Sequence, residues 1–312
     1  MKNEMIERRS FITGGLTAAT VWTNGCRTGM ADRPQETRDR ALLQREIDEV
    51  PADGMEDYFE GNGNWRALNA RYVALARLDA AFDRVVREVR EAVVTDRPAV
   101  WYLYNMGTVV KTQGSVIGLD ICHPRALELE PLLDFATISH NHCDHYTRAF
   151  YRQMDRAHKT VFSNFLDNYG AARTKGVVGG FSRGEREVNI RDVTVRTYET
   201  DHNPILRRFT MPVEIDCGGY TILHVGDTDN VEGIRPKSPV DLWIHHVYSH
   251  GLVSVRGAEY LKPKLTVITH LQELHHARDK WRFTYAQGED ARKQVVAAGY
   301  DAVVPLWGDR IV

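Results

Sequence analysis

The segment Thr137–Thr147 reads TISHNHCDHYT and decides how the rest of the chain is interpreted. A β-like run over Phe135–Ser139 ends directly in a tight loop. The loop carries four candidate ligands, which are His140, His142, Asp144 and His145. Imidazole and carboxylate groups are ligands that zinc and similar divalent ions take. Because four ligands within six residues exceed what one tetrahedral ion takes from so short a loop, the segment predicts two neighbouring ions.

The bulk composition is that of an ordinary soluble globular protein. The chain has 312 residues, of which 43% are hydrophobic and 26% charged, enough for a core of enzyme size. Its formal net charge of −2 gives no electrostatic reason to expect a nucleic-acid partner. No apolar run reaches the roughly 18 residues that a membrane-spanning helix needs.

The N-terminus carries a pattern of its own, MKNEMIERRSFITGGLTAATVWTNGC. Arg8 and Arg9 precede a short, weakly apolar stretch, an arrangement that resembles a twin-arginine export signal. Residues 1–31 are therefore predicted to be such a signal, with cleavage after Ala31, and the protein is predicted to be exported to the periplasm or cell envelope. A frayed basic helix is the alternative interpretation. Membrane association is expected only if Cys26 is lipidated, although Thr23 stands where such signals usually have Leu.

The remaining chain divides near Pro98. Residues 32–97 show apolar positions at helical spacing and are predicted to form a helical extension, broken at Gly61–Asn64, where Asn64 could cap the next helix. Residues 98–312 are predicted to form a layered α/β catalytic domain. Helices are expected at Arg148–Ala157 and Gln287–Ala298. Strands are expected at Ala99–Tyr104, Thr108–Lys111, Ser115–Leu119, Ala136–Ser139, Thr160–Ser163, Val193–Glu199, Met211–Cys217, Tyr220–Val225, Leu242–His246, Leu265–Thr269 and Ala302–Leu306.

Further acidic and histidine residues follow strand-like runs in order along the chain. They are Asp120 in VIGLD, His202 in YETDHN, Asp227 in ILHVGDTDN and His270 in LTVITH, and the chain closes on VVPLWGD. With the His-x-His-x-Asp-His loop, these motifs resemble the metallo-β-lactamase superfamily from Pro98 to the C-terminus. The resemblance implies a four-layer αββα sandwich. It also implies that Asp120 orders the metal loop by hydrogen bonding.

The same resemblance implies a ligand set for two ions. Site one would be His140, His142 and His202; site two would be Asp144, His145 and His270; Asp227 would bridge the ions. Zn²⁺ is the expected metal, and the ligand types also permit Mn²⁺ or Fe²⁺. A hydroxide held between the two ions would be the nucleophile. Cys143, at the variable position of the motif, is expected to point away from the metals.

The spelling ISHNHCDH is similar to ISHNHYDH of the N-acylphosphatidylethanolamine phospholipase D branch, and an ascorbate-6-phosphate-lactonase-like branch is also considered. His250, twenty residues before His270, is predicted to line the pocket and act with Asp144 and Asp227 in catalysis. Three other histidines, His123, His158 and His224, are expected at surface or core positions. Glu273, His275 and His276 are interpreted either as groups behind the ligands or as a solvated helix end.

These observations predict a metal-dependent hydrolase that cleaves a phosphodiester, lactone or ester. A β-lactamase-type amide hydrolase is one alternative, and an exported binding protein with an inactive site is another. A di-iron oxygen-reducing member is disfavoured, because such proteins carry Glu where His142 stands. The expected partner is a small or lipid-like substrate, and the oligomeric state is not predicted.

Overall fold

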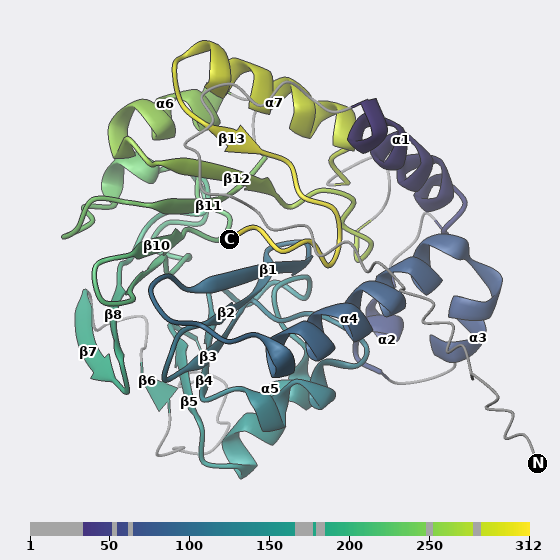
Figure 1. Ribbon diagram of the computed structural model, residues 1–312, viewed down its shortest axis with the longest axis horizontal. Coiled ribbons are helices and arrows are strands. Elements are labelled where there is room, and N and C mark those ends of the chain that lie inside the picture. The colour runs from purple at the N-terminus through teal and green to yellow at the C-terminus, as the bar shows by residue number, and fades with distance from the viewer. Residues whose placement is uncertain are drawn as a thin grey trace, which may run out of the picture.

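Two β-sheets lie face to face between outer layers of helices in the computed structural model of this chain (Figure 1). The structure describes residues 34–51, 55–61, 65–165, 177–178, 185–247, 252–276 and 282–312. The expected αββα arrangement is confirmed. The expected export signal and the proposed cap Asn64 lie outside the described residues, so they stay predictions.

The first sheet has the strand order β1-β2-β3-β4-β5-β6. Its strands are β1 (Ala99–Tyr104), β2 (Gly107–Lys111), β3 (Val116–Leu119), β4 (Phe135–Ile138), β5 (Thr160–Ser163) and β6 (Val177–Val178). The first three strands pair antiparallel, whereas β3, β4, β5 and β6 pair parallel. Parallel pairing places the carboxyl ends of β3 and β4 at one edge of the sheet.

The second sheet has the strand order β13-β12-β11-β10-β9-β8-β7. Its strands are β7 (Arg186–Ile190), β8 (Val193–Thr197), β9 (Val213–Asp216), β10 (Thr221–His224), β11 (Leu242–His246), β12 (Leu265–Thr269) and β13 (Ala302–Val303). Strands β10 to β13 pair parallel. Strands β8 and β10 both pair antiparallel with β9, so they run in the same direction and also end at one edge.

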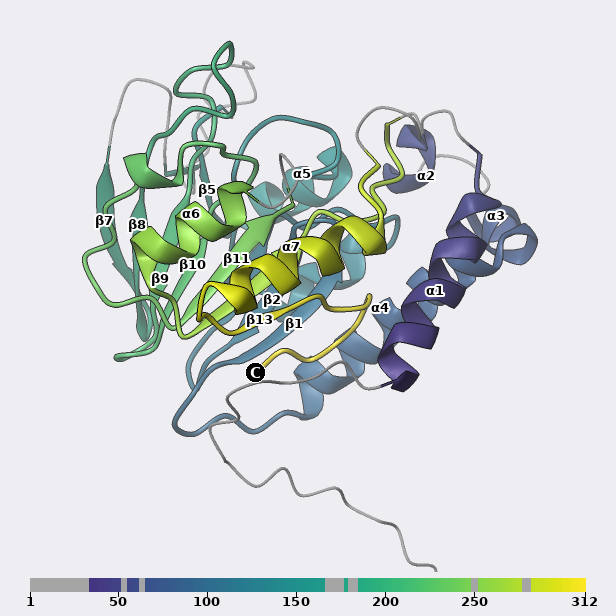
Figure 2. The ribbon, with the colours of Figure 1, turned by 90° about the horizontal axis from the view of Figure 1, so that it is seen from above.

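Helices cover the outer faces of both sheets. The helices α4 (Val73–Glu91) and α5 (Arg148–Arg156) lie on the first sheet, and α6 (Leu252–Leu261) and α7 (Tyr285–Ala297) lie on the second. The expected helical extension forms α1 (Pro34–Asp48), α2 (Glu56–Phe59), α3 (Trp65–Arg71) and α4. Figure 2 shows α1 beside α4 and α7, so the extension joins the two halves at one side of the molecule. No helix among the described residues is long and apolar enough to cross a membrane.

Strand alternation divides the buried side chains into two clusters. In β1, Val100 belongs to the cluster between the sheets, with residues such as Phe135 and Ile222. Its neighbour Trp101 belongs to the cluster beneath the helices, with residues such as Phe82. Successive side chains of a strand point to opposite faces, so one strand supplies both layers of core.

Most expected strands are present with ends that differ by one or two residues, and the larger differences have physical reasons. The expected strand Ala302–Leu306 ends at Val303, because Pro305 has no backbone N–H for a ladder. Strand β7, with the sequence REVNI, was not expected. It is a partly exposed edge strand, and because edge strands tolerate charged residues, its sequence lacks the apolar run that would have indicated a strand. Helix α6 was not expected either.

Candidate metal centre

All seven predicted metal ligands come from loops that leave the carboxyl ends of strands. Strand β4 leads into the His140–His145 loop, and β8, β10 and β12 precede His202, Asp227 and His270 respectively. Because these strands end at facing edges of the two sheets, loops far apart in sequence meet at one place. A layered sandwich thus assembles the site between its sheets rather than within one element.

The seven side chains fall into two groups that share one carboxylate. The first group is His140, His142, His202 and Asp227; the second is Asp144, His145, His270 and Asp227. Within each group the ligand atoms all lie within 4.8 Å of one another. The division matches the ligand sets that the family resemblance implied, including the shared position of Asp227.

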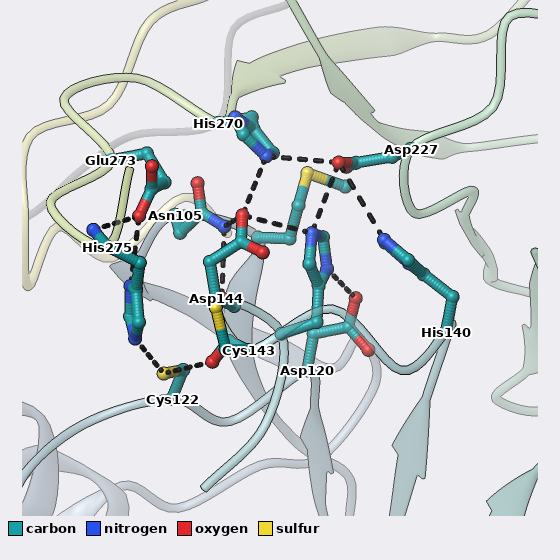
Figure 3. A network of polar contacts seen from close by, with 12 residues as sticks. Asn105, Asp120, Cys122, His140, Cys143, Asp144, Asp227, His270, Glu273 and His275 are labelled. Atoms are coloured by element: carbon teal, nitrogen blue, oxygen red, sulfur yellow. Dashed lines mark hydrogen bonds and ion pairs between the residues drawn. The ribbon is translucent and has the colours of Figure 1, made fainter. Parts of the chain in front are cut away.

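Contacts from His140 and His270 converge on the carboxylate of Asp227 (Figure 3). Its Oδ2 atom is 3.2 Å from His145 Nε2 and 3.1 Å from His270 Nε2, on the side of the second group. On the side of the first group it is 3.9 Å from His140 Nε2 and 3.8 Å from His202 Nε2. One carboxylate oxygen therefore faces imidazole nitrogens of both groups, as a bridging ligand requires.

Asp120 orders the loop from behind. Its Oδ1 accepts a hydrogen bond from Ser139 N at 2.7 Å, and its Oδ2 lies 2.8 Å from His145 Nδ1. A carboxylate bound to Nδ1 fixes the ring orientation and leaves Nε2 facing the cluster. Asp120 is fully buried and has a φ of 45°, a backbone conformation that Asp tolerates better than most residues. The geometry agrees with the ordering role expected for this residue.

Asn105 was missed by the sequence analysis. Its Nδ2 donates to Asp144 O at 3.0 Å and to Asp144 Oδ2 at 3.1 Å, and its carbonyl accepts from His270 N at 2.9 Å. It thereby ties together two loops of the second group. The one local signal is its place in the β1–β2 turn before Gly107, where Asn adopts a positive φ of 54°.

Opposite charges dominate the electrostatics of the second group. Burial by itself would lower the pKa of His270, but Asp227 and Asp144 raise that pKa to about 10. Burial would likewise lower the pKa of His145, and the same carboxylates raise it well above its ordinary value. In the first group burial lowers the pKa of His140, which keeps that imidazole neutral. The site therefore favours positive charge beside Asp144 and Asp227.

The polar atoms at the centre of the cluster fit a cation. Several buried atoms make no hydrogen bond of good geometry with any described residue, namely His140 Nε2, His145 Nε2, His202 Nε2, His270 Nε2, Asp144 Oδ1 and Asp227 Oδ1. Buried polar atoms without a well-formed hydrogen bond are costly, and all of these belong to residue types that bind divalent ions. The donor set, its burial and its charge are those of a site for such ions.

A cavity of about 280 Å³ opens onto these groups. Five of the seven predicted ligands line it, together with Asn203, Leu206, His276 and Phe283. Leu206 and Phe283 give apolar walls, whereas Asn203 and His276 offer polar atoms beside the ligands. The cavity gives a small molecule access to the cluster.

The other predicted residues have mixed outcomes. His250 lies outside the described residues, so its catalytic role stays a prediction. His123 and His224 are buried and His158 is exposed, as expected. Cys143 belongs to neither four-residue group of the central cluster.

Glu273 and the two histidines after it are not a solvated helix end. Glu273 is fully buried, and its two carboxylate oxygens lie 2.9 Å from His275 Nδ1 and 2.8 Å from His276 Nδ1. His275 stacks on Phe59 of α2 with ring centroids 4.0 Å apart, and its Nε2 lies 3.4 Å from Cys122 Sγ. The segment is a buried polar network behind the ligand loops, which agrees with the first of the two interpretations.

Comparisons with known proteins agree with this architecture. No protein-family model and no curated protein sequence matches the chain. Among solved structures it is similar to a metallo hydrolase from the hyperthermophilic archaeon Ignicoccus hospitalis, with a TM-score of 0.53, 16% identity and coverage of 69% of this chain and 98% of that one. A metallo-beta-lactamase fold protein from Bacillus subtilis gives a TM-score of 0.51 at 13% identity, covering 69% and 99%.

The chain has the metallo-β-lactamase fold. The fold by itself leaves the reaction open, because a diiron beta-hydroxylase from Streptomyces venezuelae is also similar, with a TM-score of 0.51, 12% identity and coverage of 68% and 53%.

Proposed function

We propose that this protein is a metal-dependent hydrolase whose centre holds two divalent ions. The observation that carries the proposal is the pair of ligand groups that share Asp227. In the proposal, His140, His142 and His202 hold one ion, Asp144, His145 and His270 hold the other, and Asp227 bridges them. Zinc is the proposed metal, because imidazole and carboxylate ligands suit it, and Mn²⁺ or Fe²⁺ are the alternatives.

The chain's own residues set up the chemistry. When bound, two such ions supply a hydroxide near neutral pH and polarise the oxygen of the scissile group. Asp120 and Asn105 hold His145 and Asp144 in place, so the ligand positions are set before substrate binds. Leu206 and Phe283 form an apolar part of the cavity wall. His250 is proposed to donate a proton to the leaving group, for which a pKa near neutrality is suitable.

We propose a phosphodiester, lactone or ester as the substrate, either small or lipid-like. Two features support the choice. The loop spelling is similar to that of the phospholipase D branch, and a bridging Asp is usually lacking in true β-lactamases. His142 stands where oxygen-reducing di-iron members carry Glu, which favours hydrolysis over oxidation.

The test combines metal analysis with a substrate panel. Purified full-length protein should contain two divalent ions per chain and hydrolyse at least one phosphodiester, lactone or carboxylic ester, with little turnover of β-lactams. Replacing Asp227 by Asn removes the bridging charge, so metal content should fall below two and hydrolysis should be lost. Asp290→Asn, an exposed carboxylate of α7, is the matched control and should change neither.

Three results would contradict the proposal. Full activity with at most one ion per chain would exclude the dinuclear centre. Two tightly bound ions without turnover of any panel member would favour the exported binding protein instead. Efficient β-lactam turnover alone would favour the amide-hydrolase alternative.

We also propose that the chain is exported by the twin-arginine route. Arg8 and Arg9 support this, because recognition of such a signal depends on the arginine pair. A double Lys replacement should leave the protein in the cytoplasm, measured by cell fractionation, with a Lys replacement at Arg38 as the control. Export of the double variant at the wild-type level would rule the route out, and lipid on Cys26 would indicate a membrane-anchored form.

A further inference from the structure

A third set of potential ligands lies beside the proposed dinuclear centre. One ligand atom from each of Cys143, Asp144 and His276 lies within 4.8 Å of the other two. Neither Cys143 nor His276 belongs to the two groups that share Asp227. Thiolate, carboxylate and imidazole are all zinc ligands, and zinc–ligand bonds of about 2.0–2.3 Å require only a small closing movement of such a set.

His276 is held in the orientation of a metal ligand. Its Nδ1 lies 2.8 Å from Glu273 Oε2, and Glu273 is fully buried. A carboxylate on one ring nitrogen commonly fixes a metal-binding imidazole and leaves the other nitrogen free to coordinate. His276 also lines the cavity at the centre.

Asp144 has one oxygen left for this second set. Its Oδ2 lies 3.1 Å from His270 Nε2, 3.4 Å from His145 Nε2 and 3.1 Å from Asn105 Nδ2. Asp144 is only 1% exposed, and its buried Oδ1 has no hydrogen-bond partner among the described residues. The two oxygens of this carboxylate can therefore serve two different ions.

Cys143 provides the soft ligand. It is a free cysteine of intermediate exposure, next to Asp144 in the chain. Its carbonyl accepts a hydrogen bond from Cys122 Sγ at 3.5 Å, which anchors the backbone beside Asp144 (Figure 3). The ligand set of the dinuclear centre does not include a thiol, whereas the set of Cys143, Asp144 and His276 does.

We propose that Cys143, Asp144 and His276 form an accessory site for one thiophilic divalent cation, Zn²⁺ or Cd²⁺. The inference deepens the proposed function, because the site shares Asp144 with the dinuclear centre. On binding, a sulfur–metal bond forms and the thiol proton leaves to solvent. Three protein ligands leave a fourth position for water or an anionic group of the substrate.

The test counts ions and detects the thiolate in full-length protein. Apo-protein titrated with Co²⁺ should show thiolate-to-cobalt charge-transfer absorption, and Zn²⁺ loading should reach three ions per chain by elemental analysis. Cys143→Ser and His276→Gln should each bind two ions, and Cys143→Ser should lose the absorption. Cys217→Ser, a partly buried cysteine outside the three groups, is the matched control and should keep both.

A wild-type measurement keeps the test independent of variant folding. Zn²⁺ should protect Cys143 from alkylation and leave Cys217 unprotected, as read by peptide mass analysis. Glu273→Gln should weaken the binding of the third ion by about 10–100-fold, because the His276 imidazole loses the carboxylate that orients it.

Several outcomes would overturn the accessory site. Two ions per chain without a thiolate band would contradict it, and so would alkylation of Cys143 in the presence of Zn²⁺. A thiolate band with only two ions per chain would instead place Cys143 in the dinuclear centre. These failures are separable from failure of the proposed function. Hydrolysis with two ions and no thiolate would defeat only the accessory site, whereas three ions without hydrolysis would defeat only the proposed reaction.

Discussion

The charge beside each buried imidazole decides its protonation. His145 and His270 face carboxylates, which raise their pKa values despite burial. His123 has no carboxylate partner among the described residues: it stacks on Phe82 with centroids 4.2 Å apart, and burial, helped by Arg125, lowers its pKa to about 3. Equally buried rings thus differ because of their neighbours, and His123 offers a place to measure the effect away from the metal ligands.

His123 should make the fold sensitive to acid. Its folded pKa lies below its unfolded value, so the unfolded chain gains a proton first and stability falls as pH drops below about 6.5. The His123→Phe variant keeps the stacking and removes the titration. Between about pH 7.5 and about pH 5.5, the free energy of unfolding of wild type should fall by about 1.4 kcal/mol more than that of this variant, as measured by urea unfolding of the apo-proteins.

All other histidines are common to both proteins, so the difference isolates His123. His158→Gln, at an exposed position, is the control and should follow wild type. An identical pH dependence for His123→Phe and wild type would show that His123 is not neutral in the folded protein at these pH values.

At the scale of elements, the site depends on how closely two loops approach. Gly226, between β10 and Asp227, has a φ of 58°. A Cβ atom added there would lie 2.5 Å from Ser139 Cβ, in the residue just before the His140 loop. The absence of a side chain allows the loop after β10 to lie against the loop after β4, which brings Asp227 to the histidines.

Gly226→Ala should therefore separate these loops. We expect a loss of roughly 3 kcal/mol in unfolding free energy, combining left-handed strain with overpacking, and weaker metal binding. Gly218→Ala is the matched control, because its φ is 70° and an added Cβ meets no atom within 4 Å. The control should lose only about 1–2 kcal/mol and keep its metal. Full metal content in Gly226→Ala would contradict this account of the loop approach.

The helical extension packs against the segment that follows the ligand His270. Met55 N donates to Leu274 O at 3.3 Å, and Phe59 of α2 stacks on His275. Gln44 of α1 hydrogen-bonds Gln272, two residues after His270. The segment that follows His270 is thus packed between the second sheet and the extension (Figure 2).

For the whole molecule, the extension and the sheets share one core. Phe82 of α4 is fully buried in the cluster that also holds Trp101 of β1 and Trp307 near the C-terminus. Arg40 of α1 pairs with Glu289 of α7 at 2.5 Å and donates to Val304 O at 2.7 Å. Because the core is shared, we expect the two parts to unfold together.

Phe82→Ala should accordingly destabilise the entire chain. A loss of about 3–5 kcal/mol is expected, with one transition that coincides when followed by circular dichroism and by tryptophan fluorescence. Val73→Ala, at a 51% exposed position of the same helix, should change stability little. Separate transitions for helix content and tryptophan environment would show that the extension is an independent unit.

Much of this protein was predictable from sequence, because the deciding signals are local. The His140–His145 loop directly follows a strand, and Asp120, His202, Asp227 and His270 each follow a strand-like run. A side chain that follows a strand lies near a sheet edge, so the layered fold and the clustering of these residues could be predicted, and the resemblance to the metallo-β-lactamase superfamily implied which of them would share an ion.

Only the tertiary structure decided which distant residues support those ligands. Asn105 hydrogen-bonds Asp144, which lies 39 positions away in the sequence. His276 and Cys143 belong to one group of potential ligands although more than a hundred residues separate them. The fit of Gly226 against Ser139 is likewise a contact between two different sheets. Such contacts follow from the packing of the sheets and helices on one another, and no local pattern of residues encodes a distance between loops that meet only when the layers close.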